Sequence, residues 1–180
     1  MAKIRKETAT HLFFLIGFFG FLTILHRWFS PEYILIWLGG AIGTILPNLD
    51  QLIYVYFLKP QDLSSQRVRY AFSKGQFKQG IALLGETIME RDKLIFHSVI
   101  FQVIFLVFAF LVVTSSSNLF GKGLVLGFAL DLAVDQFLDL INKDNLDSWF
   151  SDLPVRLTKD KALAFWLIGF AFLVYLGFVS

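Results

Sequence analysis

The chain has 180 residues, no cysteine and a mean hydropathy of +0.66, and 56% of its residues are hydrophobic. This composition is typical of integral membrane proteins, and the length favours one bundle, so residues 1–180 are interpreted as a single membrane domain. The lack of cysteine excludes disulfides and thiolate metal sites, which leaves His, Asp, Glu or Asn as ligands for any metal. The formal net charge of +2 is too small to identify a partner.

Five apolar runs predict an all-α, polytopic membrane bundle of about five transmembrane helices. A helix needs about 20 residues, each rising about 1.5 Å, to cross the hydrocarbon core. The predicted spans cover about residues 11–28, 33–58, 94–114, 119–141 and 162–179. The first run follows a basic tail without a small-residue cleavage site, which indicates an uncleaved anchor rather than a signal peptide.

The second run is unusually long and contains Pro47, which should kink or break the helix. After it comes the largest polar segment, a loop over residues 59–93. This loop contains two amphipathic stretches, residues 61–72 and 77–89, separated by Gly75. They predict one or two interfacial helices on the inner leaflet, with a solvated basic loop as the alternative.

The basic residues predict the orientation of the chain. All Lys and Arg except Arg27 and Lys122 lie in the N-terminal tail, the 59–93 loop or the connection before the last span. By the positive-inside rule these three segments face the cytoplasm. The sequence therefore predicts a multi-pass protein of the inner membrane, with a cytoplasmic N-terminus and a C-terminus outside.

Six ionisable residues lie inside the apolar runs or at their ends, where charged groups are costly and usually functional. In the predicted topology each lies in the cytoplasmic half of the bilayer or at its rim. Three of them are spaced four residues apart and share one helix face. Asp139 also has a simpler interpretation as a solvated residue at the boundary. The six residues are His11, Asp50, His97, Asp131, Asp135 and Asp139.

Stacked carboxylates in a medium of low dielectric constant need protons or a cation among them. Neighbouring histidines complete a set of oxygen and nitrogen ligands that suits Zn, Mn, Fe or Mg. The predicted ligands of this divalent metal ion are His11, Asp50, His97, Asp131 and Asp135. An unliganded Asp131 or Asp139 would be the catalytic base, and Arg91 and Lys93 could hold a substrate phosphate.

Four short elements carry a resemblance to a known family. They are Thr10-His11-Leu12-Phe13, Leu46-Pro47-Asn48-Leu49-Asp50-Gln51, Asp92-Lys93-Leu94-Ile95-Phe96-His97-Ser98 and Gly127-Phe128-Ala129-Leu130-Asp131-Leu132-Ala133-Val134-Asp135. In order and spacing they resemble the YdjM-like family of membrane-bound metal-dependent hydrolases. The family residues kept are His11, Pro47, Asp50, His97, Ser98, Gly127 and Asp135. The chain departs from the family pattern at five positions. Asn48 stands where the family has Asp, and Lys93 stands where it has Arg. His is replaced at three positions, by Gln51, Asp92 and Asp131.

The resemblance implies a divergent metal-dependent hydrolase, and three functional hypotheses remain open. The first is hydrolysis of a lipid-like or phosphate-bearing substrate at the cytoplasmic leaflet. The second is a non-catalytic membrane subunit or assembly partner with a degenerate site, favoured by the departures from the family pattern. The third is a proton or cation pathway along Asp131, Asp135 and Asp139. Membrane lipid, a membrane protein or a second copy are the expected partners, and nothing indicates nucleic-acid binding.

Overall fold

The computed structural model describes residues 2–87, 94–154 and 157–180, and every regular element in these ranges is a helix. The all-α prediction is therefore confirmed for the described residues. In chain order the elements are α1 (Ala2–His26), η1 (Pro31–Tyr33), α2 (Ile34–Gly43), η2 (Leu46–Asn48), α3 (Leu49–Ile53), η3 (Tyr54–Leu58), α4 (Leu63–Ser73), α5 (Phe77–Glu86), α6 (Val99–Ser115), α7 (Leu119–Lys143) and α8 (Lys159–Val179).

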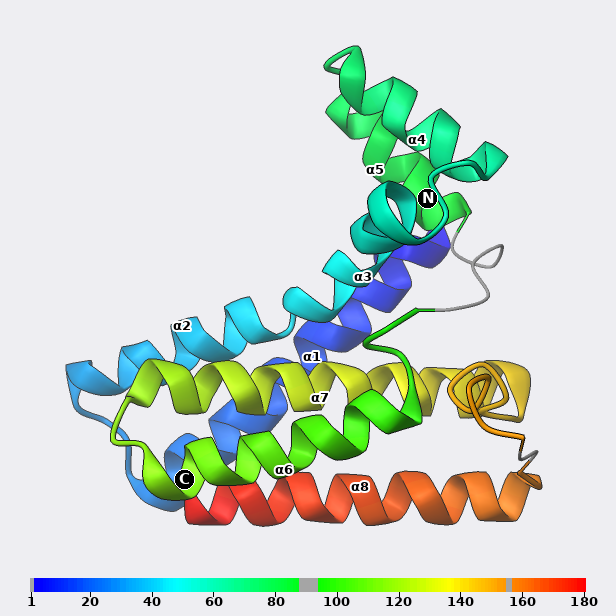
Figure 1. Ribbon diagram of the computed structural model, residues 1–180. Coiled ribbons are helices and arrows are strands. Elements are labelled where there is room, and N and C mark those ends of the chain that lie inside the picture. The colour runs from blue at the N-terminus through cyan, green and yellow to red at the C-terminus, as the bar shows by residue number, and fades with distance from the viewer. Residues whose placement is uncertain (1, 88–93, 155–156) are drawn as a thin grey trace.

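The central element is α7, which contacts α1, α2, α6 and α8. Figure 1 shows α6 and α8 running alongside α7, with α2 on its other side and α1 crossing the bundle obliquely. The α4–α5 hairpin projects away from the helices that surround α7. The start of α6, the end of α7 and the start of α8 lie together at one end of the bundle.

Glycines bring the backbones of α2 and α7 into contact. A Cβ added to Gly43 would collide with the carbonyl oxygen of Leu124, and one added to Gly127 with that of Gly40. Gly39 and Gly123 are blocked in the same way by the backbone of the opposite helix. Each helix therefore presents a Gly-x-x-x-Gly element to the other, the arrangement that lets membrane helices pack at close range.

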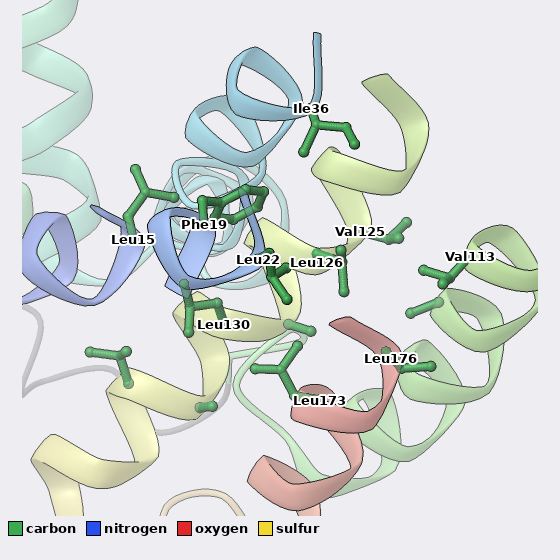
Figure 2. Packing of buried hydrophobic residues seen from close by; sticks show 14 of the residues in the cluster. Leu15, Phe19, Leu22, Ile36, Val113, Val125, Leu126, Leu130, Leu173 and Leu176 are labelled. Atoms are coloured by element: carbon green, nitrogen blue, oxygen red, sulfur yellow. The ribbon is translucent and has the colours of Figure 1, made fainter. Parts of the chain in front are cut away.

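One large hydrophobic cluster fills the interior of the bundle (Figure 2). Phe19 and Leu22 of α1 pack there with Leu126 and Leu130 of α7 and with Leu176 of α8, and all five are almost fully buried. Large apolar side chains are exposed on the outer faces of α1, α6 and α8, among them Phe13, Ile104 and Ile168. An apolar surface around an apolar core is what a bilayer-embedded bundle requires, because lipid replaces water as the solvent.

Within the described residues, three segments are long and apolar enough to cross a membrane: Thr8–His26, Pro31–Leu58 and Lys159–Val179. The five-span prediction is therefore met only in part. The fourth predicted run forms the 25-residue α7, which carries Asp131, Asp135 and Asp139 among its apolar residues. The third predicted run forms the apolar but shorter α6, of 17 residues.

The second run is broken at Pro47, as the sequence predicted. α2 ends at Gly43, a 3-10 turn contains Pro47, and the chain resumes as the short α3 followed by the wider π-helical turn η3. The third run differs from the prediction at its start, because α6 begins at Val99 rather than near Leu94. Ser98 caps α6 by accepting a hydrogen bond from the Phe101 N–H, and this fixes where the helix begins.

Candidate functional site

Five of the six ionisable residues singled out in the sequence meet in one hydrogen-bonded cluster. His11 comes from α1, Asp50 from α3, His97 from the segment just before α6, and Asp131 and Asp135 from α7. The break at Pro47 brings Asp50 to this point, since α3 begins immediately after the 3-10 turn. Residues far apart in the sequence therefore form one polar site, here called the His–Asp cluster.

Asp135 lies at the centre of the His–Asp cluster, between the two imidazole rings. Its Oδ1 is 3.2 Å from Nε2 of His11, and its Oδ2 is 3.1 Å from Nε2 of His97. Both rings thus present the same nitrogen to one carboxylate. The other nitrogen of each ring faces a different carboxylate: Nδ1 of His11 lies 2.6 Å from Oδ1 of Asp131, and Nδ1 of His97 lies 3.2 Å from Oδ2 of Asp50.

Asp50 is fully buried and organises the segment that carries His97. Its Oδ1 accepts the Ile95 N–H at 2.9 Å, and its Oδ2 accepts the N–H groups of Phe96 at 2.6 Å and His97 at 3.3 Å. A carboxylate that receives several backbone N–H groups is strongly held. The prediction of Asp50 as a metal ligand stays a prediction, and its contacts also fit a role in orienting the His97 ring.

Asp131 is almost completely buried and has one oxygen without a partner. Its Oδ1 lies 2.6 Å from Nδ1 of His11, while none of the described residues donates to its Oδ2. A buried carboxylate oxygen without a donor is unfavourable, unless a proton, a water molecule or a cation satisfies it. The structure therefore identifies Asp131 Oδ2 as the atom of the cluster with unused acceptor capacity.

The cluster is partly open to its surroundings. Side-chain exposure is 20% for His11, 19% for His97 and 25% for Asp135, against 1% for Asp131 and 0% for Asp50. The three exposed groups are those that meet at the Nε2 atoms. A ligand would therefore reach the Asp135 side of the cluster, with Asp50 and Asp131 behind the two rings.

Asp139 continues the carboxylate stripe of α7 but makes different contacts. Trp149 Nε1 donates to its Oδ2 at 3.1 Å, and the ammonium group of Lys143 lies 2.8 Å from its Oδ1. The ring of Trp149 also lies beside His97, with the ring centroids 5.3 Å apart. Both oxygens of Asp139 are thus occupied, which makes Asp131 the better placed of the two predicted bases. Arg91 and Lys93, the predicted phosphate-binding residues, lie outside the described residues.

The geometry can be compared with what a metal ion needs. In the described part of the chain, no group of three or more His, Asp or Glu side chains is arranged as a ready-made metal site. The ring nitrogens are instead paired with carboxylate oxygens. Divalent metals bind such ligands at about 2.0–2.2 Å, so adjacent ligands of one ion lie roughly 3 Å apart. The separations of 3.1 and 3.2 Å between Asp135 and the two Nε2 atoms agree with that spacing and equally with direct N–H···O hydrogen bonds.

The hydrogen-bonding pattern requires more protons than two neutral imidazole rings carry. A neutral imidazole has only one N–H, yet both nitrogens of His11 and of His97 face carboxylate oxygens. Each ring must therefore be an imidazolium, or face a protonated carboxyl, or share a cation with Asp135. If Nδ1 carries the N–H in both rings, both Nε2 atoms are left with a lone pair directed at the position beside Asp135.

Sequence reasoning missed a second polar contact in the bundle. Gln102 of α6 and Gln136 of α7 are buried and exchange two amide hydrogen bonds, of 3.1 and 2.7 Å. A glutamine in each of two neighbouring apolar runs was the available signal, because buried amides usually pair. This amide pair connects α6 to α7 at Gln136, the residue that follows Asp135.

Comparisons with known proteins returned no relatives: no family model, no curated protein and no solved structure matches the chain. The resemblance to the YdjM-like hydrolases therefore rests on the motifs quoted above.

Proposed function

We propose that this protein is a membrane-embedded, metal-dependent hydrolase whose site is the His–Asp cluster. The observation that carries the proposal is the symmetric position of Asp135 between the Nε2 atoms of His11 and His97. Two imidazoles and one carboxylate are a donor set that binds Zn, Mn or Fe in proteins. The carboxylates behind the rings support the proposal, since metal-binding histidines commonly donate their second N–H to such a group.

In this proposal His11, His97 and Asp135 are the ligands. Asp50 and Asp131 each accept the Nδ1 proton of one histidine and so keep both Nε2 lone pairs directed toward the ion. When bound, a divalent cation would polarise the scissile group and make a water molecule more acidic. Asp131 is the proposed proton acceptor, because its Oδ2 has unused acceptor capacity among the described residues.

The proposed substrate is a lipid-like or phosphate-bearing molecule at the cytoplasmic leaflet. Support comes from the position of the cluster near the end of the bundle where α3 ends and α6 begins, and from the exposed apolar faces around it. We also propose five spans, with α6 and α7 crossing alongside the three longer apolar segments. The distribution of Lys and Arg supports a cytoplasmic N-terminus and an external C-terminus.

Elemental analysis of detergent-purified protein tests the metal proposal directly. The full chain should retain about one equivalent of a divalent metal, and His11→Ala, His97→Ala or Asp135→Ala should reduce the metal content sharply. His26→Ala is the matched control. His26 is the last residue of α1 and donates to the Gly177 carbonyl near the end of α8, so it makes no contact with the cluster. Wild-type protein without metal, after purification in metal-supplemented buffer, would overturn the proposal.

A second experiment tests hydrolysis. The protein reconstituted in phospholipid vesicles should release phosphate or headgroup in the presence of Zn, Mn, Fe or Mg, and a chelator should stop the release. Asp131→Asn should retain metal and lose turnover, since an amide cannot accept the proton. Equal turnover by wild type and this variant would contradict the assignment of Asp131 as base.

One observation favours a non-catalytic alternative. All four ring nitrogens of His11 and His97 and both oxygens of Asp50 already have partners within the protein. Such a network can serve to hold α1, α3 and α7 together without binding an ion. In that case the protein is a membrane subunit or assembly partner, and the metal content of the purified chain stays at background.

A further inference from the structure

A cleft separate from the His–Asp cluster lies between the end of the second apolar run and the α4–α5 hairpin. Its volume is about 740 Å³, within the range of small-molecule and cofactor sites. Most of its wall is apolar or aromatic and comes from α3, η3, α4 and the start of α5: Leu52, Tyr56, Tyr70, Phe72 and Phe77. The cleft shares no residue with the His–Asp cluster.

Three polar side chains also line the cleft, and one of them is charged. Arg69 projects from α4 over the ring of Tyr56, with its guanidinium carbon 5.7 Å from the ring centroid. Among the described residues no carboxylate pairs with Arg69. Gln66 and Ser73 lie on the same helix and add hydrogen-bonding groups to the wall. The cleft thus combines an aromatic lining with a cation that no carboxylate of the described residues pairs with.

The residues around the cleft are of the types found where a membrane span meets the lipid headgroups. Pro31–Leu58, a segment apolar enough to cross a membrane, ends beside the cleft, and its last residues Phe57 and Leu58 are exposed. Exposed Tyr70 and Phe77 continue the apolar surface onto the hairpin. Further cations are present on the hairpin, at Arg67, Lys74 and Lys78. Aromatic and basic residues next to the end of a span are typical of the membrane–water interface.

We propose that this cleft binds one anionic membrane phospholipid. Arg69 pairs with the phosphate, for which guanidinium offers several parallel N–H donors. Gln66 and Ser73 contact the polar part of the headgroup, and the aromatic walls cover the first carbons of the acyl chains. Charge complementarity selects this occupant, because an apolar ligand would leave Arg69 unpaired and a free anion would leave the aromatic wall unused. The proposal is independent of any catalytic activity at the His–Asp cluster.

Lipid titration of the detergent-purified full chain, followed by native mass spectrometry, tests this proposal. Phosphatidylglycerol should bind at one saturable site, and phosphatidylcholine should bind more weakly. Arg69→Gln should raise the Kd for phosphatidylglycerol roughly tenfold, as expected for the loss of one charge-assisted hydrogen bond. Arg67→Gln is the matched control, since it removes the same charge from the same helix but does not line the cleft.

Each alternative has a distinct outcome. Equal weakening by Arg69→Gln and Arg67→Gln would mean diffuse attraction to the basic hairpin, and would overturn the site. Displacement of phosphatidylglycerol by millimolar inorganic phosphate would identify a free-anion site and overturn the lipid assignment. Tyr70→Ala, at an exposed residue of the wall, provides a second variant that should also raise the Kd. Its thermal melting without lipid, compared with wild type, separates lost binding from lost folding.

Discussion

The two histidines of the site make equivalent contacts, although they lie far apart in the sequence. Each ring has one carboxylate behind Nδ1 and the shared Asp135 in front of Nε2. The residues behind the rings are buried, whereas Asp135 is partly exposed. Asp135 is therefore the residue whose substitution best separates a metal centre from a purely hydrogen-bonded network.

Asp135→Asn should respond to metal differently under the two proposed functions. If His11, His97 and Asp135 hold a cation, the amide is a poorer ligand and the variant should melt lower than wild type when metal is supplied. Chelator should then remove the advantage of the wild type. If the cluster holds no cation, the variant still loses an acceptor that lies between two imidazole rings, so it should melt lower than wild type by the same amount with metal or with chelator. Melting in detergent, with and without chelator, makes the comparison.

The metal proposal should be abandoned if metal and chelator change the melting temperature of neither the wild type nor Asp135→Asn. Asp139→Asn provides the control on the same helix face, because Asp139 contacts Trp149 and Lys143 rather than the histidines. Its melting temperature should not depend on metal.

Asp50→Asn should destabilise the protein whether or not metal is present. The substitution replaces a carboxylate oxygen with an NH₂ group facing the backbone N–H groups of residues 95–97. Losing a charged acceptor for buried donors costs about 2 kcal/mol. Chemical or thermal unfolding in detergent measures the loss. A variant as stable as the wild type would show that Asp50 does not hold this segment in place.

At the level of elements, the close packing of α2 against α7 depends on glycines at the positions where the two helices cross. Gly127→Ala should lower stability by about 1–3 kcal/mol, because the new Cβ would meet the backbone of Gly40 and the helices must separate. Gly17→Ala on α1 is the matched control, since nothing lies within 4 Å of its Cβ position. It should be neutral or stabilise the helix by up to about 1 kcal/mol. Thermal melts of the two variants in one detergent compare them, and equal stability would contradict close packing at Gly127.

Several elements could be predicted from residue patterns alone. The apolar runs gave the helices, Pro47 gave the break, and Gly75 gave the division between α4 and α5. The i, i+4 spacing of Asp131 and Asp135 on one helix face, together with the topology, predicted that these residues meet the histidines. These features depend on local geometry, which the sequence encodes directly.

Other features depend on contacts between distant segments and could not be predicted from residue patterns. Asp50 was predicted as a ligand, yet it accepts backbone N–H groups from a segment 45 residues later in the chain. The contact of Asp139 with Trp149 depends on how the loop after α7 folds back. The start of α6 at Val99 depends on the Ser98 cap. Apolar run length does not reveal any of these contacts.

At the scale of the whole molecule, the two ends of the bundle carry different segments. The start of α6, the end of α7 and the start of α8 lie at one end, and the α4–α5 hairpin projects from the bundle toward that end (Figure 1). The opposite end has the short connections α1–α2 and α6–α7. Such an asymmetric bundle should have one fixed orientation in the membrane, which the basic residues predict.

The natural lack of cysteine makes that orientation measurable with single substitutions. We expect Gln76→Cys, in the exposed α4–α5 connection, to be labelled by an impermeant thiol reagent only after the cells are permeabilised. Ser117→Cys, in the exposed α6–α7 connection, should be labelled in intact cells. The reason is that all basic residues except Arg27 and Lys122 lie on the Gln76 side of the predicted topology. Labelling of Gln76→Cys from outside intact cells would reverse the orientation and move the His–Asp cluster to the outer leaflet.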